Sequence, residues 1–226
     1  MATSPGIASL FGRTDAPGYR IAMPLEPGAG GPARPSGPDD APVAVGPWRR
    51  RSRRVAYENP WIDVWQDEVD RPDGSEGIYG LVHFHSRAVG VVAVGEDGRM
   101  LLVGQHRYAL DEYSWEIPEG GVEATESLED GARRELREET GYAASRWRQV
   151  ARITLSNSVT DERGALFLAQ DLTPGVAEPD GSEVLEVRWA TLDGVLAEIA
   201  AGEIHDVLTI AGVGLYAAEL ARGGTR

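Results

Sequence analysis

Residues 120–142 read GGVEATESLEDGARRELREETGY, a run in which glycines and acidic residues stand at fixed distances from one another. Near its end, Glu135, Glu138 and Glu139 follow at the spacing i, i+3 and i+4. On a helix this spacing brings the three carboxylates to one face, where unpaired like charges would weaken the helix. A cluster of hard oxygen ligands on one face therefore predicts a site for a divalent cation such as Mg²⁺.

The same run carries the signals of a helix that begins near Ser127 and ends before Gly141. Ser127 opens a near capping box, and glycine is a natural helix stop. Apolar side chains recur at every fourth position through Leu128, Ala132 and Leu136, which predicts the buried side of the helix.

Two further residues of this run bear on the cation. Arg134 precedes Glu138 by four residues, so its guanidinium can pair with that carboxylate and fix its orientation. Gly120 lets the backbone approach closely, so its carbonyl is a candidate ligand beside Glu135 and Glu139. A cation held there would neutralise phosphate charge, orient a water and lower the pKa of that water, which predicts hydrolysis of a pyrophosphate link.

The alternative interpretation of the charge run is a solvated acidic helix with ordinary salt bridges. That alternative does not account for the flanking glycines or for carboxylates that share one face. The cation site is therefore the favoured interpretation.

The run resembles the Nudix box, whose pattern is G-x5-E-x7-R-E-U-x-E-E-x-G-U with U a bulky aliphatic residue. Every polar and glycine position matches, and only Tyr142 departs, at a packing position. The resemblance implies an enzyme that hydrolyses a nucleoside diphosphate linked to a further moiety, with Mg²⁺ or Mn²⁺. It implies that Glu135, Glu138 and Glu139 bind the metal and that Arg134 orients them, with Glu138, Glu139 and Arg134 expected to be catalytic.

The resemblance extends beyond the box. Residues 104–108 (GQHRY) and 115–120 (WEIPEG) look like the segments before the box in ADP-ribose and nucleotide-sugar pyrophosphatases. In those enzymes the residue matching Arg107 contacts phosphate, and the residue matching Glu116 lies beside substrate and metal. A surface salt bridge for Arg107 and a solvated strand end for Glu116 are the alternatives.

The resemblance favours ADP-ribose, cleaved to AMP and ribose 5-phosphate. ADP-ribose hydrolases usually carry a proline shortly beyond the box, whereas residues 156–160 (SNSVT) contain none, so another nucleotide sugar stays open. Residues 160–163 look like the same loop, and Glu162 within them is a candidate substrate contact. A Nudix-like sensor that binds nucleotide sugars without turnover is a further alternative, against which the intact carboxylate set argues.

The general base has a separate candidate segment. In this subgroup it often comes from an acidic loop after the box, and residues 178–183 (EPDGSE) match such a loop. Glu183 is the first choice and Glu178 the second, with a polar turn as the alternative. Trp61 and Tyr57 are candidates for stacking on a nucleobase, with a core or dimer contact as the alternative.

Composition limits the remaining classes of function. The formal net charge of −14 argues against non-specific nucleic-acid binding. All 22 basic residues are arginine, which disfavours a Walker-type phosphate loop and a lysine Schiff base. Without cysteine there are no disulfides, so a cytoplasmic location is the default expectation. No apolar run approaches the roughly 20 residues that span a bilayer, so no membrane association is expected. The histidines lack the paired spacing of a metal site and are expected to be structural.

The chain divides into three expected regions. Residues 1–46 hold eight of the 14 prolines and eight of the 28 glycines, a composition that predicts a largely flexible tail. Residues 47–87 are expected to form antiparallel strands, and the resemblance implies that they build a homodimer interface. Residues 88–226 are expected to form the Nudix hydrolase domain. The run 48–54 (WRRRSRR) has two interpretations, a solvated basic linker or a contact for an anion.

Period-two patterns and turn residues predict strands over most of the chain. The predicted strands are 55–57, 61–69, 77–84, 88–94, 100–105, 114–117, 149–155, 165–170 and 183–189. Helices are expected at 192–201 and 205–221, in addition to the box helix. Together these predict an α+β fold of the Nudix type, a mixed sheet between helices with antiparallel strands at the N-terminal side.

Overall fold

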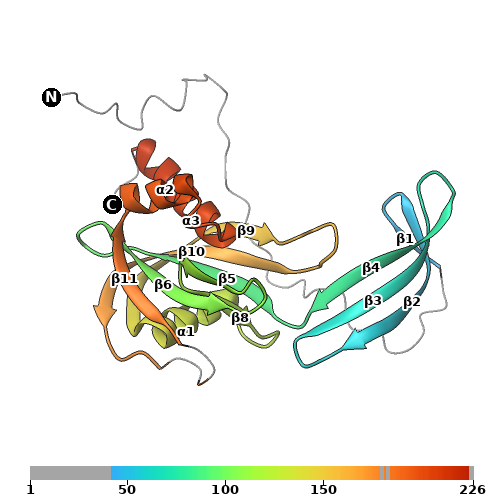
Figure 1. The fold of residues 1–226 in the computed structure, drawn as a ribbon, viewed down its shortest axis with the longest axis horizontal. Helices are drawn as coiled ribbons and strands as arrows, with labels where there is room; N and C mark the ends of the chain where they lie inside the picture. Colours follow the sequence, from blue (N-terminus) through green and yellow to red (C-terminus); the bar gives the residue numbers. More distant parts are fainter. Residues whose placement is uncertain (1–41, 179–180, 182–183, 224–226) are drawn as a thin grey trace.

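The computed structural model describes residues 42–178, 181 and 184–223. Within these residues the strands form three sheets, and the helices pack on them (Figure 1). None of the described helices combines the length and the apolar character needed to cross a membrane.

The N-terminal sheet is antiparallel and projects away from the rest of the molecule (Figure 1). Its strands follow one another in chain order: β1 (Val43–Val45), β2 (Trp48–Glu58), β3 (Ile62–Asp70) and β4 (Glu76–Phe84). Side chains of β3 alternate between buried and half-buried, as period-two geometry requires, and Trp65 is fully buried. The antiparallel N-terminal strands are therefore present as predicted.

The arginine run lies inside β2, so the alternative of a solvated linker was wrong, whereas the alternative of an anion contact stays a prediction. Arg53 pairs with Asp67 of β3 at 2.7 and 2.8 Å, and Arg51 lies 3.4 Å from Asp70. The cross-strand carboxylates offset the arginine charges, which allows so basic a segment to extend as a strand. The run of arginines lacks the alternation of apolar and polar residues that predicts a strand, so the sequence pattern did not reveal this part of β2.

Residues 87–191 contain the other two sheets. One has the order β8-β5-β10-β9, in which β5 and β10 are parallel and the other pairs antiparallel, and the second has the order β11-β6-β7. The strands are β5 (Arg87–Ala93), β6 (Arg99–Arg107), β7 (Glu112–Glu116), β8 (Glu119–Val122), β9 (Tyr142–Thr154), β10 (Arg163–Pro174) and β11 (Glu186–Thr191). The helices are α1 (Leu128–Thr140), α2 (Leu192–Ala201) and α3 (Val207–Ala221).

Helices cover both faces of the sheet with the order β8-β5-β10-β9, called the central sheet below. On one face, Val91 of β5 belongs to a core cluster with Ala132 and Leu136 of α1. On the other face, the next residue, Val92, belongs to a separate core cluster with Val213 of α3. Successive strand residues point to opposite faces, so one strand supplies both cores. The predicted mixed sheet between helices is confirmed.

The box helix has the predicted caps. Ser127 is the N-cap, and its hydroxyl accepts a hydrogen bond from the Asp130 amide. Gly141 ends the helix with φ at 75°, a left-handed conformation that favours glycine. Ala132 and Leu136 are fully buried, as the spacing predicted.

Several predicted boundaries differ from the structure. Strand β9 begins at Tyr142 rather than at residue 149, because outward-facing polar residues such as Arg146 hid its alternation. The glycine-rich β8 was not predicted at all, and β11 begins at Glu186. Strand β1 shows that ordered structure begins before residue 47, while residues 1–41 of the expected tail lie outside the described residues.

Candidate functional site

Arg134 joins the polar residues of the box. Its Nη1 donates to Glu135 Oε1 at 2.8 Å and to Glu138 Oε2 at 3.0 Å. Its Nε and Nη2 donate to the two oxygens of Glu126 at 3.3 and 3.2 Å, and Nη2 also reaches the Gly121 carbonyl at 2.8 Å. The predicted Arg134–Glu138 contact is therefore present. One guanidinium orients three carboxylates toward one side of α1.

Gly120 lies directly against the carboxylate of Glu135. A Cβ atom at position 120 would stand 2.3 Å from the carboxylate carbon, so the Glu135 carboxylate would have to move away. Glycine permits this close approach of backbone and carboxylate. It brings β8 beside the box face of α1.

Glu139 connects the box helix to the segment before it. The side chain is 4% exposed, and its Oε2 accepts a hydrogen bond from the Glu119 amide at 3.1 Å. The third predicted metal ligand thus faces residue 119, whereas Glu135 and Glu138 face Arg134. Glu135 and Glu139 thus contact β8 directly, and Arg134 links Glu138 to the Gly121 carbonyl of the same strand.

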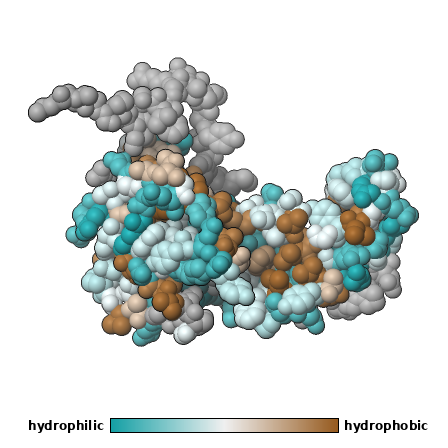
Figure 2. Space-filling view, viewed as in Figure 1, coloured by the Kyte–Doolittle hydropathy of each residue, from teal (hydrophilic) through white to brown (hydrophobic). Residues whose placement is uncertain are grey.

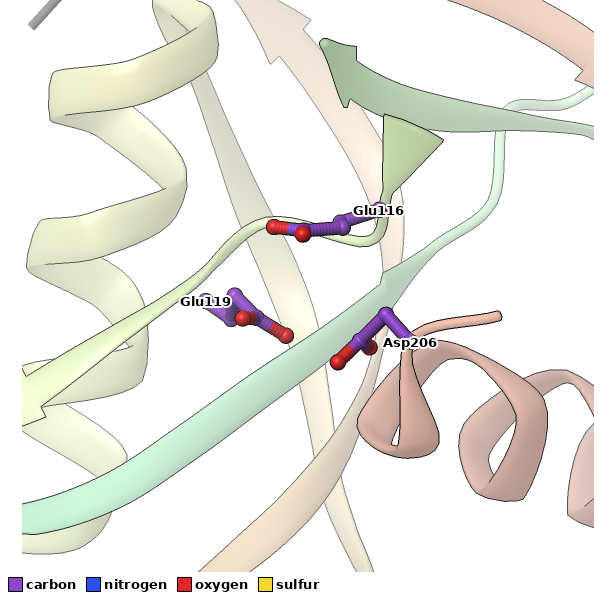
Figure 3. Close-up of side chains that lie close together, drawn as sticks. All are labelled: Glu116, Glu119 and Asp206. Atoms are coloured by element: carbon purple, nitrogen blue, oxygen red, sulfur yellow. The ribbon is translucent and has the colours of Figure 1, made fainter. Parts of the chain in front are cut away.

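A second acidic cluster lies next to this contact between α1 and β8 (Figure 3). Glu116, Glu119 and Asp206 each offer a carboxylate oxygen, and these oxygens lie within 4.8 Å of one another. They come from β7, β8 and the N-cap of α3, and the close-up shows their carboxylates gathered in one small region. Like charges this close repel one another unless cations or protons separate them.

Asp206 is held in place by α3. Its Oδ2 accepts a hydrogen bond from the Thr209 amide at 2.6 Å. The buried Thr209 hydroxyl in turn accepts from the Ile117 amide at 2.9 Å. Through this chain, α3 is fixed against the segment that carries Glu116 and Glu119.

Burial raises the pKa of Glu119 well above its ordinary value, and the negative charges of Asp206 and Glu116 raise that pKa further. Arg107 opposes these effects, because its Nη2 lies 2.6 Å from Glu119 Oε1. The other oxygen, Glu119 Oε2, is buried and has no hydrogen-bond partner among the described residues. A buried carboxylate oxygen without a donor is suited to a cation.

Arg107 forms the salt bridge expected as the alternative to a phosphate contact. Its Nε lies 3.0 Å from both oxygens of Glu116, and its side chain is 36% exposed. Burial acts to lower the pKa of Arg107, but the hydrogen bonds and charge of Glu116 outweigh it and raise that pKa above its ordinary value. Glu116 itself is buried, so the alternative of a solvated strand end was wrong.

A hollow of about 360 Å³ opens beside the acidic cluster. Its lining includes Trp61, Glu162, Asp206, Glu119 and Gly120. Trp61 is 72% exposed, which excludes a core role for this side chain. Burial, together with the charge of Asp161, raises the pKa of Glu162. The structure thus brings two predicted substrate contacts to the same hollow as the box glycine.

The two candidates for the general base, Glu183 and Glu178, belong to the acidic loop after the box. Glu183 lies outside the described residues. Glu178 is described and exposed, and its backbone amide donates to the Glu138 carbonyl at 3.0 Å, which places the start of the acidic loop at the end of α1. The predictions for both residues therefore remain predictions.

Sequence reasoning missed Glu119 and Asp206 as members of the site. Glu119 stands inside the segment 115–120, where only Glu116 was selected. Asp206 carries the signal of an N-cap, an aspartate just before an apolar helix, but nothing local indicates that the cap faces the box. Only the packing of α3 on the sheet brings the two together.

The donor set fits a divalent cation. The box face and the acidic cluster supply carboxylate oxygens, which hard cations prefer, and one of these oxygens is buried without a donor. Glu119, Glu116 and Asp206 would hold such a cation together with the box carboxylates that Arg134 orients.

Comparisons with known proteins agree with this geometry. Residues 84–209 match the model of the NUDIX domain, and residues 48–82 match that of the nucleoside diphosphate sugar hydrolase N-terminal domain. The chain is 35% identical over 160 residues to an ADP-ribose pyrophosphatase of Bacillus subtilis (strain 168), over 70% of this chain and 86% of the relative. It is 30% identical over 181 residues to a CMP-5'-(N-acetyl-N-hydroxy-3-aminopropyl)phosphonate hydrolase of Streptomyces rubellomurinus, over 79% and 85%.

A solved structure supports the fold. The crystal structure of an ADP compounds hydrolase superposes with a TM-score of 0.69 at 20% identity, over 76% of this chain and 93% of that chain. Fold, box geometry and sequence likeness together define a hydrolase of the Nudix class with an additional N-terminal sheet. The chain belongs to the Nudix family, and the predicted family and enzyme class are confirmed.

Proposed function

We propose that this Nudix hydrolase cleaves the pyrophosphate bond of ADP-ribose, giving AMP and ribose 5-phosphate, with Mg²⁺ as the cation and Mn²⁺ as a substitute. Support comes from the ADP-ribose pyrophosphatase of Bacillus subtilis and from the N-terminal domain match. The observation that carries the proposal is the Arg134 network, which orients Glu135 and Glu138. Glu135 in turn lies against Gly120, which lines the hollow together with Glu119.

The chemistry needs no covalent protein intermediate. The oxygen of a water forms a bond to one phosphorus, the bond from that phosphorus to the bridging oxygen breaks, and the bridging oxygen leaves with the other phosphate. A bound divalent cation supplies charge neutralisation and a lowered pKa of the water. The proton of the water passes to a carboxylate, for which Glu183 is our first choice and Glu178 our second.

The substrate contacts are proposed from the hollow. Trp61 is exposed at its edge, where its ring can stack on a base, and Glu162 can accept hydrogen bonds from sugar hydroxyls. Arg107 is the proposed phosphate contact, because its side chain is partly exposed beside Glu116. These roles require Arg107 to exchange one of its carboxylate partners for phosphate.

The test is a product assay with Mg²⁺ on ADP-ribose, ADP-glucose, GDP-mannose and nucleoside triphosphates. We expect AMP and ribose 5-phosphate from ADP-ribose at the highest kcat/KM. Faster cleavage of another nucleotide sugar would replace ADP-ribose with that substrate. Binding without cleavage of any of them would establish a sensor and contradict the enzyme.

The assay includes a matched pair of variants on α1. Glu138→Gln removes a carboxylate that Arg134 orients, and we expect kcat to fall by about two orders of magnitude. Glu129→Gln makes the same change at an exposed residue that pairs with Arg133, and we expect activity to stay at the wild-type level. Equal activity of both variants would contradict the metal assignment.

A further inference from the structure

The segment between β9 and β10 is fastened to the N-terminal sheet. The Val82 amide donates to the Val159 carbonyl at 2.8 Å, and the Asp161 amide donates to the Val82 carbonyl at 3.2 Å. Val82 and Thr160 form a parallel β-bridge. The segment therefore continues the edge of β4 for a short distance and ends one residue before Glu162.

Asp161 directs its whole carboxylate toward β4. Its Oδ2 lies 2.6 Å from His83 Nδ1, and its Oδ1 accepts from the Phe84 amide at 3.2 Å. Both side chains of the His83–Asp161 pair are 11% exposed. A largely buried and doubly hydrogen-bonded carboxylate fixes the backbone on which it stands.

His83 is itself held by the interior of the N-terminal sheet. The His83 ring stacks on the Trp65 ring, with the two ring centroids 4.3 Å apart. The Arg53 guanidinium also lies over the Trp65 ring, 4.2 Å from its centroid. The His83 ring and the Arg53 guanidinium are both too close to the Trp65 ring to lie on the same face of it, so the indole lies between them. Because Arg53 is also paired with Asp67, the histidine has little freedom to move.

Glu162 follows Asp161 directly and lines the hollow of the candidate site. Its backbone carbonyl accepts from the Leu155 amide at 3.2 Å, which closes the segment at its other end. The Asp161 carboxylate contacts the N-terminal sheet, whereas Glu162 lines the hollow of the candidate site and also a hollow of about 450 Å³ that residues of the N-terminal sheet line. The position of Glu162 thus depends on how Asp161 is held.

We propose that His83 and Asp161 form a positioning pair that holds Glu162 at the substrate hollow, so that the N-terminal sheet sets a substrate contact of the Nudix domain. This inference rests on the proposed function of the hollow. Neither residue of the pair touches substrate, and the histidine is more than a packing residue of its sheet.

The test is a double-mutant cycle on the full chain with ADP-ribose and Mg²⁺. His83→Phe keeps the stacking on Trp65 and removes the hydrogen-bond donor to Asp161. We expect KM to rise roughly tenfold with kcat within about a factor of two, because uniform substrate binding is lost. In a Glu162→Gln background, His83→Phe should raise KM by less than about twofold, because the contact it positions is already gone.

Two further variants keep the result interpretable. Asp161→Ala removes the other partner of the pair. If His83→Phe fails to fold, Asp161→Ala takes its place in the double-mutant cycle with Glu162→Gln. Glu219→Ala breaks the exposed Arg148–Glu219 ion pair and should leave KM unchanged.

Two results would overturn the positioning role while the proposed function stands. One is a KM for His83→Phe equal to that of the wild type. The other is a rise in KM on His83→Phe that is as large in the Glu162→Gln background as in the wild type. If the wild-type chain cleaves no diphosphate substrate, the proposed function falls, and the positioning role falls with it.

Discussion

Arg134 contributes more to the site than a single salt bridge, because one guanidinium orients Glu126, Glu135 and Glu138. Arg134→Lys keeps the charge but replaces a planar group with five donors by a flexible ammonium. We expect kcat to fall by about tenfold or more with a small change in melting temperature. Arg133→Lys, on the exposed side of α1, is the matched control and should retain full activity. Equal activity of the two variants would contradict the orienting role.

The half-buried Glu162 carboxyl makes the free energy of unfolding depend on pH. Its folded-state pKa is raised above the ordinary value, so the folded state holds this proton more tightly than the unfolded state does. The charge therefore costs stability at pH 7.5, and this cost disappears as pH falls below the unfolded pKa. We expect Glu162→Gln to raise the free energy of unfolding at pH 7.5 and to have little effect at pH 4, as measured by urea denaturation. An equal effect at both pH values would show that the carboxylate charge carries no such cost.

The residues of the box were predictable, and those that complete the site were not. Glu135, Glu138 and Arg134 lie within one helix, where spacing along the chain fixes spacing in space. Glu119 and Asp206 come together only when β8 and α3 pack on the same sheet, which no local pattern records.

At the scale of elements, close packing at glycine sets the geometry of the central sheet. Gly164 of β10 pairs with Ala88 of β5, and a Cβ at position 164 would stand 1.9 Å from the Ala88 carbonyl oxygen. We expect Gly164→Ala to lower the free energy of unfolding by about 2 kcal/mol or more, because backbone must move. Gly214→Ala places a Cβ in open space on α3 and should instead raise stability by roughly 0.5–1 kcal/mol. Chemical denaturation of both variants tests this, and similar values would contradict it.

The same scale explains which elements sequence patterns predicted. Helix α2 and the caps of α1 agree with the structure because their signals are local. Strand β2 was partly hidden by arginines, whose partners lie on β3. Strand β8 was hidden by its two glycines, of which Gly120 lies against the Glu135 carboxylate. Both strands depend on contacts with a neighbouring element, β3 for β2 and α1 for β8, and the local sequence pattern does not record such contacts.

At the scale of the whole molecule, the N-terminal sheet leaves apolar side chains in solvent. Figure 2 shows hydrophobic residues gathered over this sheet, and Val45, Tyr57 and Ile78 are each more than half exposed. We propose that the sheet forms the interface of a homodimer. Multi-angle light scattering should give twice the chain mass for the wild type and a lower mass for Ile78→Arg. A monomeric wild-type chain at micromolar concentration would contradict the dimer.

The central claim is that box carboxylates and a divalent cation act together on a nucleoside diphosphate sugar. The most direct measurement is the rate of AMP release from ADP-ribose as free Mg²⁺ is varied, for the wild type and Glu138→Gln. We expect release by the wild type only when the cation is added, and a rate for the variant about two orders of magnitude lower at every Mg²⁺ concentration. AMP release that is independent of the cation, or unchanged in Glu138→Gln, would contradict the account.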